Sequence, residues 1–241
     1  MDLPAVAQSH MAIVAASERR RSGVPFRPEA EAALAPLLID IASELARGRD
    51  IVAIPEFIGP FGVADLVAVY NGQEWYLVRR ANGVPPVLNE VDALVLGAAS
   101  VRFGRSVAEL AARTHLPGHA LDTSISRLRR IGALSQRSDD RLVRAGGFAP
   151  AQLHAIEAKV DDWRRGLSQA QRYALWADQV TLVLGGAPRR IEELQQALMK
   201  TRIGLAIAGE LVRRPKRTLL PLGRRMWAAE HLFAMLGGTR A

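Results

Sequence analysis

The spacing of apolar residues predicts a helix followed by strands in the first third of the chain. Residues 28–48 carry apolar side chains at helical spacing, and the helix is expected to end at Gly48. Short apolar runs rich in branched residues then predict buried strands, the last of them placed after Asn71-Gly72, a dipeptide typical of hairpin turns. The strands expected here are 51–57, 62–70 and 73–80.

The pattern changes over residues 87–147. Three helices are expected there, the second of them opened by Ser106 with Glu109 in position to complete a capping box. A small hairpin with a polar tip follows over 134–146. Three helices and a hairpin in this order resemble a winged helix-turn-helix. A plain helical insertion is the alternative interpretation.

Strands and helices alternate again beyond this segment. A strand ending in Glu-Ala-Lys-Val precedes a helix whose cap is Asp161 or Asp162. The elements expected in this part are strand 152–160, helix 161–177, strand 179–186, a helix near 190–200, strand 203–211 and a last helix ending near Leu236. We therefore expect an α/β domain formed by residues 1–86 and 148–241 and interrupted by an inserted domain at 87–147.

Composition narrows the class of protein. A net charge of +8 over 241 residues favours a polyanionic partner, nucleic acid first and an anionic membrane surface second, unless arginine is simply abundant. The absence of cysteine excludes disulfides, thiol catalysis and thiolate metal sites. No apolar run is long enough to span a membrane, and the N-terminal segment lacks the order of a secretory signal. We expect a cytoplasmic protein with no membrane partner.

Charged residues interrupt two of the apolar strands. Glu157 and Lys159 are two apart and therefore share one face of their strand, and Asp65 is the lone acid of 62–70. Burying such charges is costly unless they are paired or meet a ligand. An Asp and a Glu on neighbouring strands suit Mg²⁺, and a lysine beside them can orient a water or stabilise an oxyanion. A structural ion pair and a solvated aspartate at a strand edge are the alternatives.

This arrangement resembles the PD-(D/E)XK nuclease superfamily, whose core is αβββαβ. The matching residues are Asp65, Glu157 and Lys159, and the following helix adds Gln169 and Tyr173 in the Q-x-x-x-Y pattern of the exonuclease-type branch. The resemblance covers residues 28–86 and 150–208. It implies a restriction-endonuclease-like fold, Mg²⁺ or Mn²⁺ as cofactor, and hydrolysis of DNA.

Two departures from the family pattern accompany the resemblance. Ala64 stands where the motif has proline, and the segment 87–147 separates the two acid-bearing strands. Glu56 is a further candidate metal ligand, and Glu44 on the first helix is another candidate acid. Gln169 and Tyr173 also fit ordinary packing and surface positions of a helix.

The winged-helix resemblance implies DNA contacts from the third helix and the hairpin. The residues expected to make them are Thr123, Ser124, Ser126, Arg127, Arg130, Arg137 and Arg141. The leading hypothesis is a metal-dependent DNA nuclease in defence, restriction or repair, acting as a homodimer or in a larger complex. The alternatives are a non-catalytic DNA-binding regulator and an adaptor of a defence complex on the same scaffold.

Overall fold

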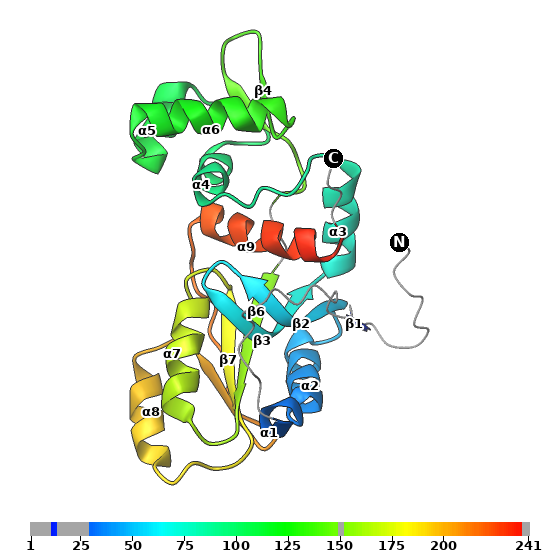
Figure 1. The fold of residues 1–241 in the computed structure, drawn as a ribbon, viewed down its shortest axis with the longest axis vertical. Helices are drawn as coiled ribbons and strands as arrows, with labels where there is room; N and C mark the ends of the chain where they lie inside the picture. Colours follow the sequence, from blue (N-terminus) through cyan, green and yellow to red (C-terminus); the bar gives the residue numbers. More distant parts are fainter. Residues whose placement is uncertain (1–10, 14–28, 149–151, 238–241) are drawn as a thin grey trace. The chain divides into compact units, whose positions relative to one another are not determined.

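The computed structural model describes residues 11–13, 29–148 and 152–237 (Figure 1). The chain divides into two compact units, one of residues 1–73 and 151–219 and the other of residues 74–150 and 220–241. Helices and a mixed β-sheet confirm the α/β class. None of the helices in the described ranges has both the length and the apolar character needed to cross a membrane.

A seven-stranded sheet forms the centre of the first unit, in the order β1-β2-β3-β6-β7-β8-β9. β2, β3 and β6 are mutually antiparallel, whereas β7 runs parallel to β6 and β8 parallel to β7. The short edge strand β1 pairs parallel with β2, and β9 pairs antiparallel with β8. The strands are β1 (Met11–Ile13), β2 (Ile51–Gly59), β3 (Gly62–Tyr70), β6 (Gln152–Lys159), β7 (Gln179–Leu184), β8 (Gly204–Ile207) and β9 (Glu210–Arg213).

Helices cover both faces of this sheet (Figure 1). The predicted helix over 28–48 is present as two pieces, and its apolar stripe packs on the face that carries Leu66 and Ile156. Because side chains alternate along a strand, Glu157 and Lys159 point to the opposite face. The helix α7 (Trp163–Tyr173) packs on that face. The helices of this unit are α1 (Glu29–Ala32), α2 (Ala35–Ala46), α7 (Trp163–Tyr173) and α8 (Ile191–Met199).

The second unit is mostly helical. The expected three helices and hairpin are all present, and Ser106 and Glu109 form the predicted capping box. Buried residues from these elements and from the last helix share one apolar core. The elements are α3 (Gly72–Ala81), α4 (Glu90–Ala98), α5 (Val107–Thr114), α6 (Gly118–Arg130), β4 (Leu134–Gln136), β5 (Leu142–Arg144) and α9 (Leu222–Met235).

The strand expected over 73–80 is wrong, because this segment is the helix α3. Trp75, Tyr76 and Arg79 are buried at helical spacing, and both aromatic rings pack against Phe233. A short apolar run does not by itself distinguish a strand from a helix, and the Asn-Gly signal misled the prediction. The third strand of the antiparallel set is β6 instead.

The single strand expected over 203–211 is also wrong. The segment forms the antiparallel pair β8 and β9. Ala208 and Gly209 both adopt positive φ, at 50° and 88°, and turn the chain between the two strands. The Ala-Gly dipeptide is a weak turn signal, since alanine seldom adopts this backbone conformation.

A buried ion pair fixes α3 to α9. Arg79 donates from Nε and Nη2 to the two carboxylate oxygens of Glu230 at 2.8 and 2.7 Å, and both side chains are fully buried. Arg79→Met is expected to lower the free energy of unfolding by about 3–5 kcal/mol, because it leaves Glu230 as an unpaired buried charge. Urea unfolding checks this value. The double variant Arg79→Met/Glu230→Met should regain part of the loss, and a single variant as stable as the wild type would contradict the prediction.

Candidate active site

The candidate site is built on the adjacent strands β3 and β6. Their register pairs Leu66 with Ile156, which places Asp65 and Glu157 opposite each other at the next position. The Asp65 carboxylate accepts a hydrogen bond from the backbone N–H of Ala158 at 2.7 Å, so it closes the ladder where the two strands separate. The two acids therefore lie on one face of the sheet.

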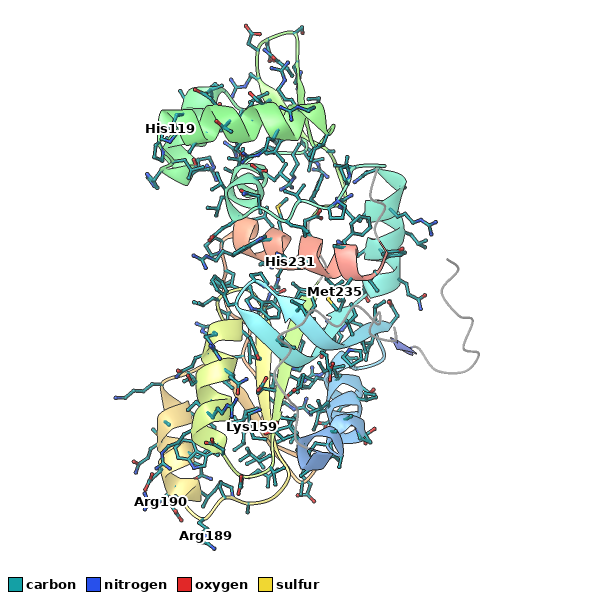
Figure 2. All side chains as sticks on the ribbon, in the orientation of Figure 1. His119, Lys159, Arg189, Arg190, His231 and Met235 are labelled. Atoms are coloured by element: carbon teal, nitrogen blue, oxygen red, sulfur yellow. The ribbon has the colours of Figure 1, made fainter. Side chains whose placement is uncertain are left out.

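Lys159 lies at the end of β6 beside α7 (Figure 2). Its ammonium group donates to Glu157 Oε1 at 2.8 Å and to the Ala158 carbonyl at 2.8 Å. It also lies 3.4 Å from Oε1 of Glu31, on α1. The side chain is almost fully buried, and its ammonium group is held by several fixed oxygens.

The helix α7 packs closely over this lysine through Gly166. A Cβ atom at Gly166 would lie 2.6 Å from Cδ1 of Leu182 and 2.8 Å from Cγ of Lys159. Both distances are shorter than van der Waals contact, so a larger residue would push the helix away from the strand. The glycine thus allows the lysine stem to pass beneath the helix.

Gln169 and Tyr173 lie on the same face of α7 as Gly166, since they are three and seven residues further along. The Tyr173 hydroxyl is 2.9 Å from Glu157 Oε2 and also bonds to the Val63 carbonyl. Gln169 Oε1 is buried and has no hydrogen-bond partner in the described part of the chain. The structure therefore joins Tyr173 to the acids and leaves an unsatisfied amide oxygen one turn away.

Burial raises the pKa of Glu157 to about 7, and the negative charge of Asp65 adds to the effect. Lys159 and Tyr173 oppose it by hydrogen bonding to the carboxylate. The hydrogen bonds of the Tyr173 hydroxyl also favour a protonated Glu157. The hydroxyl has one proton but lies beside two oxygens, the Val63 carbonyl and Glu157 Oε2. When that proton goes to the Val63 carbonyl, the phenol oxygen can only accept, and a protonated Glu157 is the matching donor.

The pKa of Lys159 is raised above its ordinary value. Burial alone would lower it, but Glu157, Asp65 and Glu31 together outweigh that cost. The lysine therefore remains charged at neutral pH. Burial remains the main cause of the raised pKa of Glu157, and the negative charge of Asp65 adds to it.

Two acids proposed from the sequence do not join this cluster. Glu56 is exposed and adopts φ 49° within β2, and no three acidic or histidine side chains in the described ranges are grouped so as to hold a metal ion. Its assignment as a metal ligand is therefore not supported. Glu44 lies on the exposed side of α2, where it pairs with Arg214 at 2.8 Å. Sequence reasoning missed Glu31, the acid of the first helical segment that does reach Lys159.

The residues expected to contact DNA in the second unit fall into three groups. Ser124 is fully buried, so its assignment to a DNA-facing surface is wrong: the serine lies on the inner side of α6. Two of the arginines are engaged within the unit. Arg127 donates two hydrogen bonds to the Asp92 carboxylate, and Arg141 donates to the Gly104 carbonyl and to Glu109. The exposed members are Thr123, Ser126, Arg130 and Arg137.

The geometry thus joins Asp65, Glu157, Lys159 and Tyr173 on one face of the sheet. Hard oxygen donors beside a fixed ammonium group suit chemistry on a phosphate ester. Comparison of the chain with protein-family models, curated proteins and solved structures found no match.

Proposed function

We propose that the chain is a metal-dependent DNA nuclease with a restriction-endonuclease-like core. The observation that carries the proposal is the convergence of Asp65, Glu157 and Lys159 from two adjacent strands. The order α2-β2-β3-β6-α7-β7, with three antiparallel strands and a fourth parallel to the third, supports it because it agrees with the αβββαβ pattern. The basic charge of the chain fits a nucleic acid substrate.

The residues at the site fit a hard divalent cation. Asp65 and Glu157 offer carboxylate oxygens, and the buried Oε1 of Gln169 lacks a hydrogen-bond partner among the described residues. Two carboxylates suffice for Mg²⁺, which usually keeps several waters and takes substrate phosphate as a further ligand. A bound Mg²⁺ or Mn²⁺ supplies charge at the scissile phosphate and acidifies an attacking water.

The chain's own groups supply positioning and charge. Lys159 presents a compact ammonium group that can hold an attacking water or meet the developing oxyanion. Tyr173 fixes the Glu157 carboxyl through Oε2, and Lys159 fixes it through Oε1. Glu31 lies 3.4 Å from the ammonium group and adds to the effect of Glu157 and Asp65 on its pKa. The catalytic assignments are Asp65, Glu157 and Lys159, with Tyr173, Gln169 and Glu31 as positioning residues.

Cleavage of plasmid and linear DNA by the purified full chain tests the proposal. We expect cleavage with Mg²⁺ or Mn²⁺, none with EDTA, and recovery when excess metal is restored. Comparison of circular with linear substrate distinguishes endonuclease from exonuclease activity. Metal-independent cleavage, or none in any divalent ion, would contradict the proposed function.

The raised pKa of Glu157 predicts opposite pH dependences with and without metal. Without metal, the protonated carboxyl stabilises the fold most at low pH, and this contribution is lost as the pH rises through about 7. Metal binding needs the carboxylate, so Mg²⁺ should raise the melting temperature more near about pH 8 than near about pH 6. Asp65, Lys159 and Tyr173 face this carboxyl.

Thermal unfolding at several pH values, with Mg²⁺ or EDTA, measures both effects. Glu157→Gln should remove the two dependences together, because the amide does not titrate. Glu44→Gln is the matched control, since it alters an exposed glutamate of the same unit that is paired with Arg214. An equal Mg²⁺ shift at both pH values would exclude Glu157 as a ligand.

A DNA-binding regulator on a non-catalytic core is the second candidate function. The observation that favours it is the direct Lys159–Glu157 ion pair, which satisfies both charges without a ligand. The exposed arginines of α6 and the β4–β5 hairpin suit phosphate contacts in either case. DNA binding without cleavage under every metal condition would select this function.

A further inference from the structure

The second unit contains an arginine-lined pocket of about 390 Å³. Its walls come from the end of α4, the loop that leads to α5, α5 itself, β5 and the start of α9. Arg102, Arg105, Arg113 and Arg144 line it, and none of its lining residues in the described ranges is acidic. The exposed residues of α6 that are expected to meet DNA take no part in it.

Arg144 is buried in the wall of this pocket, and no carboxylate in the described part of the chain pairs with it. Its Nη1 donates to the Leu96 carbonyl at 2.9 Å and to the sulfur of Met226 at 3.1 Å. Neither Nε nor Nη2 has an acceptor within the described ranges, and burial lowers the pKa of the guanidinium. A buried guanidinium normally has its donors satisfied, so the Nε/Nη2 edge lacks a ligand.

Two other arginines of the same unit use their Nε and Nη2 atoms to bind a carboxylate. Arg79 holds Glu230 through Nε and Nη2, and Arg127 holds Asp92 in the same way. Both are two-bond contacts to an oxyanion, the geometry in which arginine binds carboxylate and phosphate most strongly. In Arg144 the equivalent pair of donors belongs to a residue that lines the pocket.

Further side chains around the pocket add to its preference for an anion. The Nε of Arg105 is also buried and has no acceptor among the residues that the structure describes, whereas Arg102 and Arg113 are exposed. Ser100 Oγ accepts the backbone N–H groups of Arg102 and Phe103, which leaves its own proton to be donated. Phe103 lines the pocket and is 74% exposed, an unusual position for a phenylalanine.

We propose that this pocket binds the phosphate of a nucleotide, with the phosphate among the four arginines and the base stacked on Phe103. The volume lies in the range of small-ligand sites. Exposed aromatic rings beside basic surfaces stack the bases of single-stranded nucleic acids, and the same stacking can hold the base of one nucleotide. The nucleotide is either free or the terminal unit of a nucleic acid strand, since both present the same phosphate and base.

Calorimetric titration of the full chain with deoxyadenosine 5′-monophosphate tests the proposal. Deoxyadenosine and inorganic phosphate are titrated beside it, and so are short oligodeoxynucleotides with and without a 5′-phosphate. The pocket variant is Arg102→Gln/Arg113→Gln, which changes two exposed residues and leaves the buried ones intact. The matched control is Arg47→Gln/Arg80→Gln, which removes the same charge from exposed positions outside the pocket and outside α6.

We expect the monophosphate to bind at least about tenfold more tightly than deoxyadenosine, and the pocket variant to lose at least about tenfold in affinity, the loss expected for one charged hydrogen bond. The control should bind like the wild type. Phe103→Ala should weaken binding of the monophosphate but not of inorganic phosphate.

The two sources of the phosphate give different results. Binding of the free monophosphate assigns the pocket to a free nucleotide, and binding of the 5′-phosphorylated strand alone assigns it to strand ends. Equal losses in the pocket variant and the control, or no phosphate-dependent binding of either probe, overturn the proposal. DNA cleavage is a separate measurement, because these variants leave Asp65, Glu157 and Lys159 unchanged.

Discussion

Asp65→Asn is expected to lower the rate of Mg²⁺-dependent DNA cleavage by about 10³-fold while the fold is retained. The amide oxygen of asparagine can still accept the N–H of Ala158, which Asp65 now accepts at 2.7 Å. The ladder between β3 and β6 therefore keeps its terminal bond. The charge that would bind a divalent cation is lost. Asparagine is a sharper test than alanine, which would leave the Ala158 N–H without its acceptor.

A second measurement on the same variant separates charge from structure. Asp65 contributes to the raised pKa of Glu157, so its neutralisation should move that pKa downward toward the ordinary value. Titration of the Glu157 carboxyl by NMR, in the absence of metal, reports the change. Glu44→Gln serves as the control and should alter neither cleavage nor this pKa. Wild-type cleavage by a folded Asp65→Asn protein would refute the metal-site assignment.

Most elements could be predicted from the sequence because their local signals agree with their packing. The capping box of Ser106 and Glu109 and the cap at Asp162 mark helices that the structure contains. The segment of α3 differs because its apolar residues do not reveal their partners. Trp75 and Tyr76 pack on Phe233, far along the chain, and this tertiary contact decides between helix and strand.

The candidate site could be predicted only in part for a similar reason. Glu157 and Lys159 share a strand face by simple alternation, so their proximity follows from sequence. Glu31 and Glu44 lie on either side of the break between α1 and α2, and no local signal says which acid turns toward Lys159. In the same way, composition shows that arginine is abundant but not that Arg144 is buried and pairs with no carboxylate in the ranges that the structure describes.

The strongest distinction between a structural and a catalytic lysine comes from Lys159→Arg. Arginine retains a positive charge and can pair with Glu157, so a purely structural ion pair should tolerate it. The ammonium group of Lys159, however, lies 2.8 Å from both Glu157 Oε1 and the Ala158 carbonyl, beneath the close approach of Gly166. The planar, wider guanidinium would place its charge elsewhere in this narrow space. We therefore expect Lys159→Arg to cut DNA at least about 10²-fold more slowly than the wild type.

Single-turnover cleavage with saturating enzyme measures the chemical step apart from DNA binding. Affinity for DNA should change little, because one buried charge contributes little to a contact made by many exposed arginines. Lys200→Arg is the matched control, since Lys200 is exposed at the end of α8. Lys159→Met adds a complementary result: it keeps a stem of similar length but removes the charge, which should raise the pKa of Glu157 further because Lys159 now lowers it. If Lys159→Arg cleaves at the wild-type rate while Asp65→Asn does not, the lysine is a structural partner of Glu157, and the positive charge for the reaction must come from the metal or from another residue.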